Sequence, residues 1–566
     1  MKVYEWDIID YERATAVDFC REGLNPLVSV LLASRGISSI DDARKITGEV
    51  PGAIHDPLLM ADMEKAVRRI RSAIDSSERI AVYGDYDVDG MTSCAILALW
   101  LSSKNADFEV YIPDRLGEGY GINCAALDAL KSRGASLIIS VDCGITAIAE
   151  AAYARSIGLD LVITDHHECR AELPVAAAIV DPKRCDCSYP NKDLAGVGVA
   201  FKLICALEPD FSIDEMIYRF GDFVAIGTVA DVMPINEENR ELIRRGLKIM
   251  NSSLRPCFLH LLQDSAQGIG RISASTVGYY LAPRLNAAGR MGKNDLSLKL
   301  MLADDELEAG SLAAELCELN TMRRKEENAI YEKADAIALQ ARPNEPIIIA
   351  QHGWHRGVTG IVASKIAAQY KVPAIIISID ENGIGRASCR SYGTFGIYQA
   401  ITKCKDILMD YGGHETASGV TIAEDNIEEF KQRLTEYFRD EYGDGFKPKL
   451  HIDFEVKKAE LLAIKNIAAL EQLEPYGNGH LSPCLCIKNA ELASFQSIGD
   501  GRHTRLQIDK SGKRFDCIYF SMPSDELGVI QGMLVDVAFE PQINEFRGRT
   551  NVQLLVLGIR PSGVEG

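Results

Sequence analysis

The sequence predicts an α/β chain: a first domain built on a parallel sheet, a long connecting helix, a second α/β region and a small C-terminal β-barrel. Between residues 79 and 180, short β-rich runs alternate with helical patterns, which indicates βαβ units. Residues 296–342 are rich in Leu, Ala, Glu, Arg and Lys, as in a helical arm. After about residue 450, short strand-like runs separated by Gly, Asp and Ser turns are typical of a barrel.

The length of 566 residues and the 47% hydrophobic content allow several cores, so about two to four domains are expected. Residues 1–78 carry no motif, and we expect a helical lead-in that packs on the parallel sheet. The expected boundaries are a lead-in at 1–50, the parallel-sheet domain at 51–295, the helical arm at 296–342, the second α/β domain at 343–447 and the barrel at 448–566.

The individual elements follow from hydrophobic periodicity. In the first domain, strands are expected at 80–83, 137–141, 161–163 and 178–180, and helices at 93–103, 125–132, 146–157, 198–207 and 213–232. The second region has strand patterns at 346–350 and 373–379, a helix after Gly360, and glycine-punctuated segments at 383–391 and 411–419. Barrel strands are expected at 504–508, 514–520, 534–539 and 552–557.

Composition excludes several classes of protein. The formal net charge of -20 argues against loose adhesion to nucleic acid, which depends on neutralising phosphates, but not against a local basic groove. No apolar run approaches the roughly 18 residues of a membrane span, and the acidic start does not resemble a signal peptide. Fifteen scattered cysteines fit a reduced cytosol. The pairs at 185/187 and 484/486 lack the spacing and nearby histidines of a zinc site.

Acidic and imidazole side chains follow the strand-like runs of the first domain. They are Asp85, Asp87 and Asp89 after the first run, Asp142 after the second, Asp165-His166-His167 after the third and Asp181 after the fourth. Because the carboxyl ends of parallel strands line one crevice, these groups are expected to meet there. Gathered carboxylates repel one another unless cations hold them, so the sequence predicts a metal site.

The aspartates have two other possible roles, as calcium ligands of an EF-hand or as helix caps. An EF-hand calcium loop starting at Asp85 fails, because its twelfth residue is Ile96 rather than a bidentate Glu and the segment follows a strand. Helix capping explains one aspartate of this segment but not three alternating ones at the same terminus. For Asp142 taken alone, capping remains an equally good interpretation; beside Asp165-His166-His167, the metal-ligand interpretation is favoured.

The ligand types indicate which metal and which chemistry to expect. Asp231, at the end of an apolar helical pattern, adds another carboxylate. Oxygen ligands with an imidazole suit Mn²⁺ or Mg²⁺, and the carboxylates suffice for two ions that stabilise attacking and leaving oxygens at phosphorus. There is no Walker lysine motif, and residues 196–201 lack the last glycine of a dinucleotide fingerprint, so hydrolysis is favoured over nucleotide-dependent transfer.

These motifs resemble those of a known family. Residues 84–90, 141–144, 165–167 and the Asp231 segment are similar, in order, to the motifs of the DHH phosphoesterase superfamily, and Tyr411-Gly412-Gly413-His414 is similar to the signature of its associated domain. Segments 112–115, 282–290, 319–324 and 544–550 resemble those of the superfamily's bacterial single-strand-specific 5′→3′ DNA exonucleases. The resemblance covers nearly the whole chain after about residue 50.

The resemblance implies roles for individual residues. Two Mn²⁺ or Mg²⁺ ions would be held by Asp85, Asp87, Asp89, Asp142, His166 and Asp231, with Asp142 and Asp231 as bridges. His167 would be a ligand or touch the scissile phosphate, and Asp165 would orient an imidazole. The 5′ end would be gripped by Arg115, Arg284, Ser388 and Arg390, with Gly413 and His414 near the phosphate. Arg284 and Arg290 have a plainer alternative, pairing with surface acids. The barrel would be an OB-fold platform for single strands.

The resemblance further implies a processive, single-strand-specific 5′→3′ DNA exonuclease that releases 5′-mononucleotides by a two-metal mechanism in recombination and repair. The expected partners are single-stranded DNA with a 5′ end, a helicase and a single-strand-binding protein; the expected state is a cytoplasmic monomer with no membrane association. Two alternatives are a phosphoesterase acting on short oligonucleotides or cyclic dinucleotides, and an inactive replication scaffold. The phosphate-gripping arginines and barrel count against the first, and the complete ligand set counts against the second.

Overall fold

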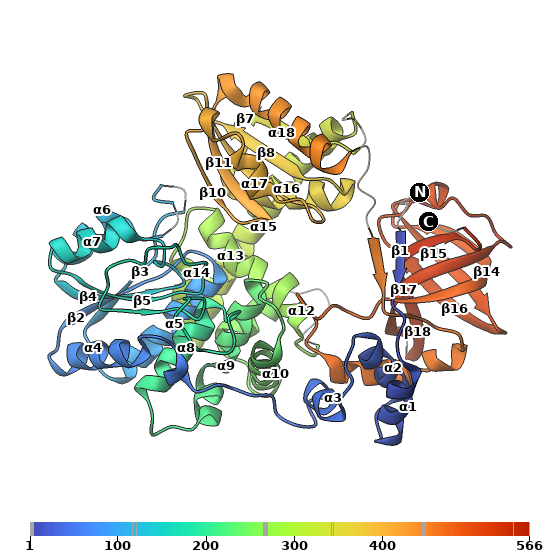
Figure 1. The fold of residues 1–566 in the computed structure, drawn as a ribbon, viewed down its shortest axis with the longest axis horizontal. Helices are drawn as coiled ribbons and strands as arrows, with labels where there is room; N and C mark the ends of the chain where they lie inside the picture. The colour runs from blue at the N-terminus through green and yellow to red at the C-terminus, as the bar shows by residue number, and fades with distance from the viewer. Residues whose placement is uncertain are drawn as a thin grey trace. The chain divides into compact units, whose positions relative to one another are not determined.

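The computed structural model describes residues 5–115, 117–119, 121–263, 270–340, 342, 344–443, 449–546 and 548–564. The chain forms two compact units (Figure 1): residues 53–446, and residues 1–52 together with 447–566. In the part of the chain so described, no helix combines the length and the apolar character that a membrane crossing needs.

The first half of unit 53–446 is built on a fully parallel sheet, as predicted. Its strands are β2 (Arg79–Tyr83), β3 (Phe108–Tyr111), β4 (Ala135–Val141), β5 (Asp160–Thr164) and β6 (Ala178–Val180), in the order β3-β2-β4-β5-β6. One face packs against α4 (Met63–Asp75), α5 (Val88–Ser103) and α8 (Gly196–Leu207), and the other against α6 (Cys124–Ser132) and α7 (Ile148–Ser156). The central strands read as continuous apolar runs because both faces are covered.

Helices complete this half and connect it to the next. They are α9 (Ile213–Ala230), α10 (Glu237–Ser252), α11 (Pro256–Gln263), α12 (Ala274–Thr276), the π-helical turn η2 (Val277–Leu281), α13 (Ala282–Arg290), α14 (Leu296–Leu302) and α15 (Glu306–Ala338). The predicted arm is therefore two helices. Asp305 is the N-cap of α15, because its carboxylate accepts hydrogen bonds from Leu307 N and Glu308 N in the first turn.

The second half of the unit is a mixed five-stranded sheet. Its strands are β7 (Ile347–His352), β8 (Ala374–Ile379), β9 (Ile384–Arg390), β10 (Asp410–Gly413) and β11 (Ala417–Ala423), in the order β10-β11-β9-β8-β7. Only β7 and β8 are parallel. The helix α16 (Arg356–Tyr370) packs with α15 on one face, and α17 (Ile397–Thr402) and α18 (Ile427–Tyr442) cover the other. The two glycine-punctuated segments are thus β9 and the β10–β11 hairpin.

The C-terminal part of the other unit is a closed five-stranded barrel, as predicted. After β12 (Lys449–Ile452), β13 (Phe454–Glu455) and α19 (Ile464–Ala468) come the barrel strands β14 (Leu485–Ile498), β15 (His503–Lys510), β16 (Lys513–Tyr519), β17 (Leu534–Phe546) and β18 (Arg549–Pro561). The order β14-β15-β16-β18-β17 closes by pairing of β17 with β14, and β16 lies parallel to β18. This is the strand order of an OB-fold.

The expected packing of the lead-in on the parallel sheet is wrong for residues 1–52. The segment comprises β1 (Glu5–Ile8), α1 (Arg13–Arg21), α2 (Pro26–Ser34) and α3 (Ile40–Thr47). β1 pairs with β12, and Leu27 and Leu31 are buried in one core with barrel residues such as Phe539. Among the helices of residues 1–78, α4 is the one that covers the parallel sheet, and it follows residues 1–52 in the chain. The sequence of an amphipathic helix shows that one apolar face must be buried, but it does not show against which sheet.

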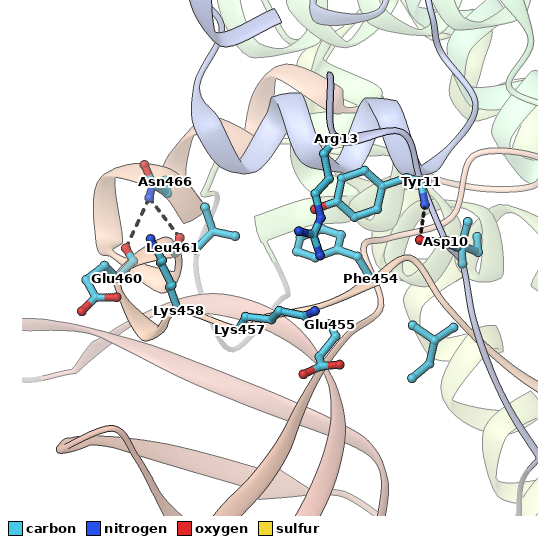
Figure 2. Close-up of a pocket in the computed structure, with 12 residues that line it drawn as sticks. Asp10, Tyr11, Arg13, Phe454, Glu455, Lys457, Lys458, Glu460, Leu461 and Asn466 are labelled. Atoms are coloured by element: carbon cyan, nitrogen blue, oxygen red, sulfur yellow. Dashed lines mark hydrogen bonds between the residues drawn. The ribbon is translucent and has the colours of Figure 1, made fainter. Parts of the chain in front are cut away.

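A cavity of about 560 Å³ lies between the lead-in and the chain entering the barrel (Figure 2). Tyr11 and Phe454 form one part of its lining, and the rest combines charged side chains, such as Arg13 and Glu455, with apolar ones, such as Leu461. None of the predicted site residues lines it.

Candidate metal centre and anion site

The three aspartates after β2 have three different environments. Asp87 caps α5, since its carboxylate accepts a hydrogen bond from Gly90 N at 3.0 Å. Asp89 instead caps α8, because its two oxygens accept from Gly196 N at 2.6 Å and Val197 N at 2.8 Å. Asp85 caps neither helix, and its buried Oδ1 has no hydrogen-bond partner. Capping therefore accounts for two of the carboxylates and leaves an orphaned oxygen on the third.

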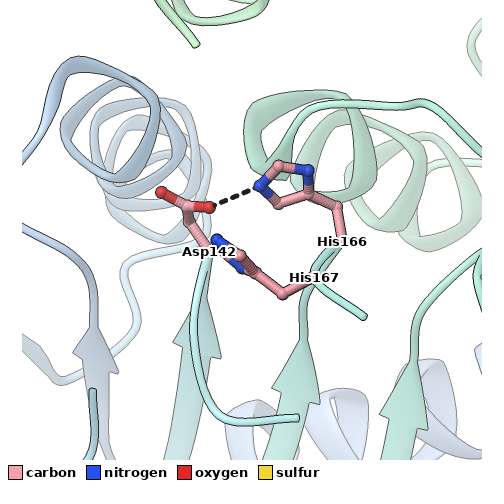
Figure 3. A group of neighbouring side chains, drawn as sticks. All are labelled: Asp142, His166 and His167. Carbon is pink, nitrogen blue, oxygen red and sulfur yellow. Dashed lines mark ion pairs between the residues drawn. The ribbon is translucent and has the colours of Figure 1, made fainter. Parts of the chain in front are cut away.

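His166 is the point where four elements of the first half meet. Its Nε2 lies 3.0 Å from Asp142 Oδ1, 3.6 Å from Asp231 Oδ2 and 3.8 Å from Asp89 Oδ2. Figure 3 shows Asp142 and His166 pointing toward each other from neighbouring strand ends, with His167 beside them. Asp231 is the C-cap of α9. The predicted meeting of these side chains is thus a feature of the fold.

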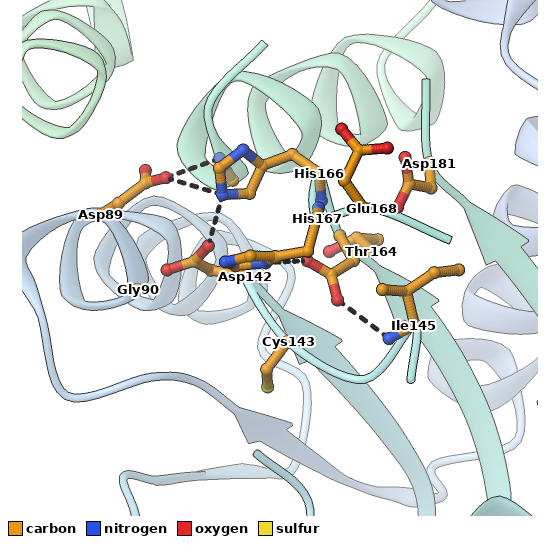
Figure 4. A network of polar contacts seen from close by, with 12 residues as sticks. Asp89, Gly90, Asp142, Cys143, Ile145, Thr164, His166, His167, Glu168 and Asp181 are labelled. Carbon is orange, nitrogen blue, oxygen red and sulfur yellow. Dashed lines mark hydrogen bonds and ion pairs between the residues drawn. The ribbon is translucent and has the colours of Figure 1, made fainter. Parts of the chain in front are cut away.

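Asp165 organises the histidine loop rather than facing the cluster. Its Oδ1 lies 2.7 Å from His167 Nδ1 and accepts from His166 N, while its Oδ2 accepts from Ile145 N at 2.9 Å (Figure 4). The ring of His167 faces the ring of His414 at 6.3 Å, nearly parallel. His414 follows β10 in the second half, so both halves of the unit contribute to this site.

Electrostatics shows how unfavourable the cluster is without cations. Burial, followed by repulsion from Asp87, raises the pKa of Asp89 to about 7, and burial with repulsion from Asp89 raises the pKa of Asp231 to about 8. The pKa values of Asp85 and Asp142 are raised well above the ordinary value, mainly by burial. Burial and the charge of His167 lower the pKa of His166 to about 3, which leaves a neutral imidazole suited to a metal.

These residues fit two divalent cations. Ligand atoms lie within 4.8 Å of one another in three groups: Asp142, His166 and His167; Asp89, His166 and Asp231; and Asp85, Asp87 and Asp142. Asp142 belongs to two of the groups, as expected of a carboxylate that would bridge two ions, and His166 also belongs to two. Carboxylate oxygens with one or two imidazoles match Mn²⁺ or Mg²⁺, and the orphaned oxygen of Asp85 is a donor that an ion would satisfy.

Glycines bring the helices close enough to build the cluster. An added Cβ at Gly196 would lie 2.6 Å from Asp142 Cβ, and one at Gly227 would lie 2.4 Å from Thr92 Oγ1 and 2.9 Å from Asp89 Oδ1. A Cβ at Gly90 would lie 2.6 Å from Asp85 O. Backbone therefore packs directly against the carboxylates that the site requires.

A group of arginines forms a second, positively charged part of the site. The Arg115 guanidinium lies 4.6 Å from the ring centre of Tyr86, the residue between Asp85 and Asp87 in the chain. Arg290 Nη1 donates to Gly357 O at 2.9 Å, and Arg390 Nε donates to Ser364 Oγ at 3.2 Å. Burial, then the charges of Arg115, Arg323 and Arg390, lower the pKa of Arg290 to about 9. Among the described residues, none of Arg115, Arg290 and Arg390 forms an ion pair with a carboxylate.

The arginine group lies at the N-terminus of α16. An added Cβ at Gly360 would be 2.9 Å from Arg390 Nη2 and 3.5 Å from Ser388 Oγ, and Ser388 Oγ is 3.0 Å from Thr359 Oγ1. Unpaired guanidinium groups, hydroxyls and a helix N-terminus together favour an anion.

Arg284 was expected in this group, but no contact joins it to the other arginines among the described residues, and its Nη1 donates to Tyr280 O at 2.8 Å. Arg290 was expected to face a ligand or to pair with a surface acid, and was not among the residues expected to grip the 5′ end. It lies in the arginine group. Gly289 was an available signal, because a Cβ there would approach Tyr86 O to 3.1 Å and marks where α13 meets the aspartate loop. Gly413 has φ +136, and a Cβ there would lie 2.5 Å from Ser418 Cα, so this turn before His414 requires glycine.

Comparison with known proteins places these features in a family. The chain matches the DHH family N-terminal domain at residues 79–228, the DHHA1 domain at 344–440 and the RecJ OB domain at 452–557. The single-stranded-DNA-specific exonuclease RecJ of Bacillus subtilis is 38% identical over 537 residues, covering 94% of this chain and 68% of that protein. Its counterpart in Salmonella typhimurium is 33% identical, covering 95% of this chain and 96% of that protein.

Two solved structures of RecJ also match this chain. The crystal structure of RecJ in complex with Mn²⁺ from Thermus thermophilus matches 99% of this chain and 80% of that chain, with a TM-score of 0.84 and 26% identity. A crystal structure of exonuclease RecJ bound to manganese matches 69% of this chain and 96% of that chain, with a TM-score of 0.58 and 33% identity.

Replacing Gly196 by Ala is expected to weaken Mn²⁺ binding by about 10- to 100-fold, because the new methyl group must displace Asp142 or pull α8 away from Asp89. Titration calorimetry with Mn²⁺ measures the effect. Gly310→Ala is the matched control, since the nearest atom to its added Cβ is 3.6 Å away. Unchanged Mn²⁺ affinity in Gly196→Ala would contradict the packing argument.

The raised carboxylate pKa values predict a pH-dependent, metal-linked stability. Between about pH 5 and 9 the folded, metal-free chain loses protons at Asp89 and Asp231 that the unfolded chain has already lost. Its thermal stability in EDTA should therefore fall as pH rises through 7 to 8, whereas stabilisation by Mn²⁺ should increase, because binding requires ionised ligands. Thermal unfolding across this range tests both. Stabilisation by Mn²⁺ that stays constant from about pH 6 to 9 would refute the linkage.

Proposed function

Because the chain belongs to the RecJ family of single-stranded-DNA-specific exonucleases, we propose that it degrades single-stranded DNA from the 5′ end at the cluster around His166. The observation that carries the proposal is the convergence of carboxylates from three segments, at Asp89, Asp142 and Asp231, on the neutral imidazole of His166. The enzyme is a metal-dependent exonuclease, and its products are 5′-mononucleotides in this proposal.

The proposed metal ligands lie in the three overlapping groups around His166. Asp85, Asp87, Asp89, Asp142, His166 and Asp231 would hold two Mn²⁺ or Mg²⁺ ions, and Asp142 and Asp231, which both lie close to His166 Nε2, would be shared between them. When bound, the ions polarise the scissile phosphodiester and the water that attacks it. Asp89 has a second role, since the hydrogen bonds from Gly196 and Val197 tie α8 to the cluster.

His167 acts on the phosphate through its charge. Burial lowers its pKa, but the hydrogen bond to Asp165 and the charges of Asp165, Asp231 and Asp87 together outweigh burial and raise the pKa to about 9, so both ring nitrogens hold protons at neutral pH. Asp165 receives Nδ1–H, and Nε2–H is available to a phosphate oxygen as negative charge develops there. His414, facing this ring from the second half, lies close to the same phosphate in the proposed complex, next to Gly413.

The arginine group binds the 5′-terminal phosphate. Arg115, Arg290, Arg390 and Ser388 present cationic and hydroxyl donors to an anion, and the first turns of α16 add their dipole. Tyr86 connects this group to the carboxylates, because it stacks under Arg115 and lies between Asp85 and Asp87. Holding the terminal phosphate here while cutting at the carboxylates would give a 5′ polarity and release single nucleotides.

The remaining parts of the proposal concern substrate and setting. The OB-fold barrel supplies a further platform for the single strand. The fifteen cysteines are scattered along the chain, which suits a reducing cytoplasm, the proposed location. We propose that the protein acts as a monomer in recombination and repair, on strands exposed by a helicase or covered by a single-strand-binding protein. A phosphoesterase of very small substrates would need neither the barrel nor the arginine group.

Asp142→Ala is expected to reduce Mn²⁺-dependent degradation of single-stranded DNA by about 100-fold or more, since it removes a proposed bridge between the ions. The assay compares strands labelled at the 5′ or 3′ end. Early release of labelled mononucleotide from the 5′-labelled strand alone supports the polarity. Asp440→Ala, at an exposed position on α18, is the control. Early release from the 3′ label, or full activity in Asp142→Ala, would refute the proposal.

Arg290→Ala is expected to raise KM for a 5′-phosphorylated strand by about 10- to 100-fold, because it removes charge-assisted hydrogen bonds to the terminal phosphate. KM for a 5′-hydroxyl strand should change much less. Arg284→Ala, on the same helix, should retain the wild-type discrimination between the two strands. Equal losses on both strands in Arg290→Ala would show that Arg290 does not recognise the 5′ phosphate.

A further inference from the structure

Two adjacent tyrosines on the surface of unit 53–446 have no role in the proposed chemistry. Tyr279 is 79% exposed and Tyr280 is 39% exposed. They lie in η2, the π-helical turn that joins α12 to α13, two helices labelled in Figure 1. In the described part of the chain, neither ring stacks on another aromatic ring or a cation. π-helical turns are rare and are frequently found at functional sites.

Pro283 accounts for the widened turn. It has no N–H to donate to the carbonyl of Tyr279 four residues earlier, and in a regular α-helix its ring would clash with that carbonyl. Arg284 lies just beyond, and its side chain donates to Tyr280 O at 2.8 Å. The local sequence therefore specifies an irregular turn, in which both tyrosines are exposed.

The turn packs against the helix whose C-cap is Asp231, a proposed metal ligand. An added Cβ at Gly278 would be 3.9 Å from Val229 Cγ1, so η2 rests on the last turn of α9, two residues before Asp231. In the other direction the helix continues through α13 to Arg290, roughly 15 Å along the axis from the tyrosines at 1.5 Å per residue. The tyrosines thus stand on the segment that connects the carboxylates to the arginine group.

We propose that Tyr279 and Tyr280 form a stacking platform for unpaired bases of the DNA strand near the site of cleavage. The proposal rests on the proposed function and adds to it a site that recognises bases rather than phosphates. Aromatic rings stack on any base, so the platform is tolerant of sequence. In a duplex the faces of the bases are already occupied by their neighbours, so the same rings would favour single strands.

The test measures binding in an Asp142→Ala background, which keeps the strand intact. Fluorescence anisotropy compares a 5′-phosphorylated oligothymidylate with an abasic strand of the same length. Tyr279→Ala is expected to raise Kd for the oligothymidylate by about 5- to 100-fold and to leave Kd for the abasic strand unchanged. Tyr279→Phe should bind as the parent does, because stacking needs the ring and not the hydroxyl. The salt dependence of binding should not change, since no phosphate contact is lost.

The control is Tyr218→Ala. Tyr218 is 71% exposed on α9, but it lies thirteen residues before Asp231, or roughly 20 Å along the helix. A Tyr279→Ala, Tyr280→Ala double variant that melts like the parent and binds the oligothymidylate unchanged would overturn the platform. Equal losses on both strands would overturn it too, since the tyrosines would then not be reading bases. Wild-type protein that leaves single-stranded DNA intact with Mn²⁺ would instead refute the proposed function, so the two failures are distinguishable.

Discussion

Mutual repulsion among buried carboxylates at the carboxyl edge of one parallel sheet is the constraint on which this architecture depends. The strands bring the acids together, and burial strengthens their repulsion, as the raised pKa of Asp142 and its neighbours shows. The fold offsets part of the cost with the amides at the start of α8, which bond both oxygens of Asp89. Divalent cations would neutralise the remaining negative charge of the carboxylates. Metal binding is thus built into the stability of this half of the molecule and not added to a finished site.

Both halves of unit 53–446 contribute to the proposed site. The parallel-sheet half carries the negative cluster that would hold the ions, and the mixed sheet carries Ser388 and Arg390 beside the N-terminus of α16. Contacts join the two halves at the site. Arg290 donates to Gly357 O, and the ring of His167 faces that of His414. In the proposed function, a strand end bound at the arginine group would reach the carboxylates at a fixed spacing, which is what release of a constant product requires.

The parts of this site that sequence could predict are those coded locally. Strand ends followed by Asp or His are visible in the order of residues, and the parallel sheet that brings Asp85, Asp142 and His166 together follows from βαβ periodicity. What depended on tertiary packing was not predicted. The bond between Asp89 and Gly196 spans 107 positions, and nothing near Asp89 marks it. Arg284 and Arg290 occur in the same helix, α13. The sequence does not show which side of this helix faces the aspartate loop, and that side determines which arginine joins the group. The packing of the lead-in against the barrel was also not predicted, because it too depends on tertiary contacts between distant segments.

The charge of the chain constrains how it could bind a polyanion at all. With a net charge of -20, and with surface cations such as Arg69, Arg79 and Arg433 already paired to acids, general attraction to DNA is weak. The cations without a carboxylate partner are concentrated, among the described residues of the site, at Arg115, Arg290 and Arg390, which could hold one phosphate but not a long backbone. Contacts that do not depend on charge would add affinity for the remainder of a strand. Base stacking is an interaction that a single strand offers and a duplex withholds, so it would favour single strands even on an acidic protein.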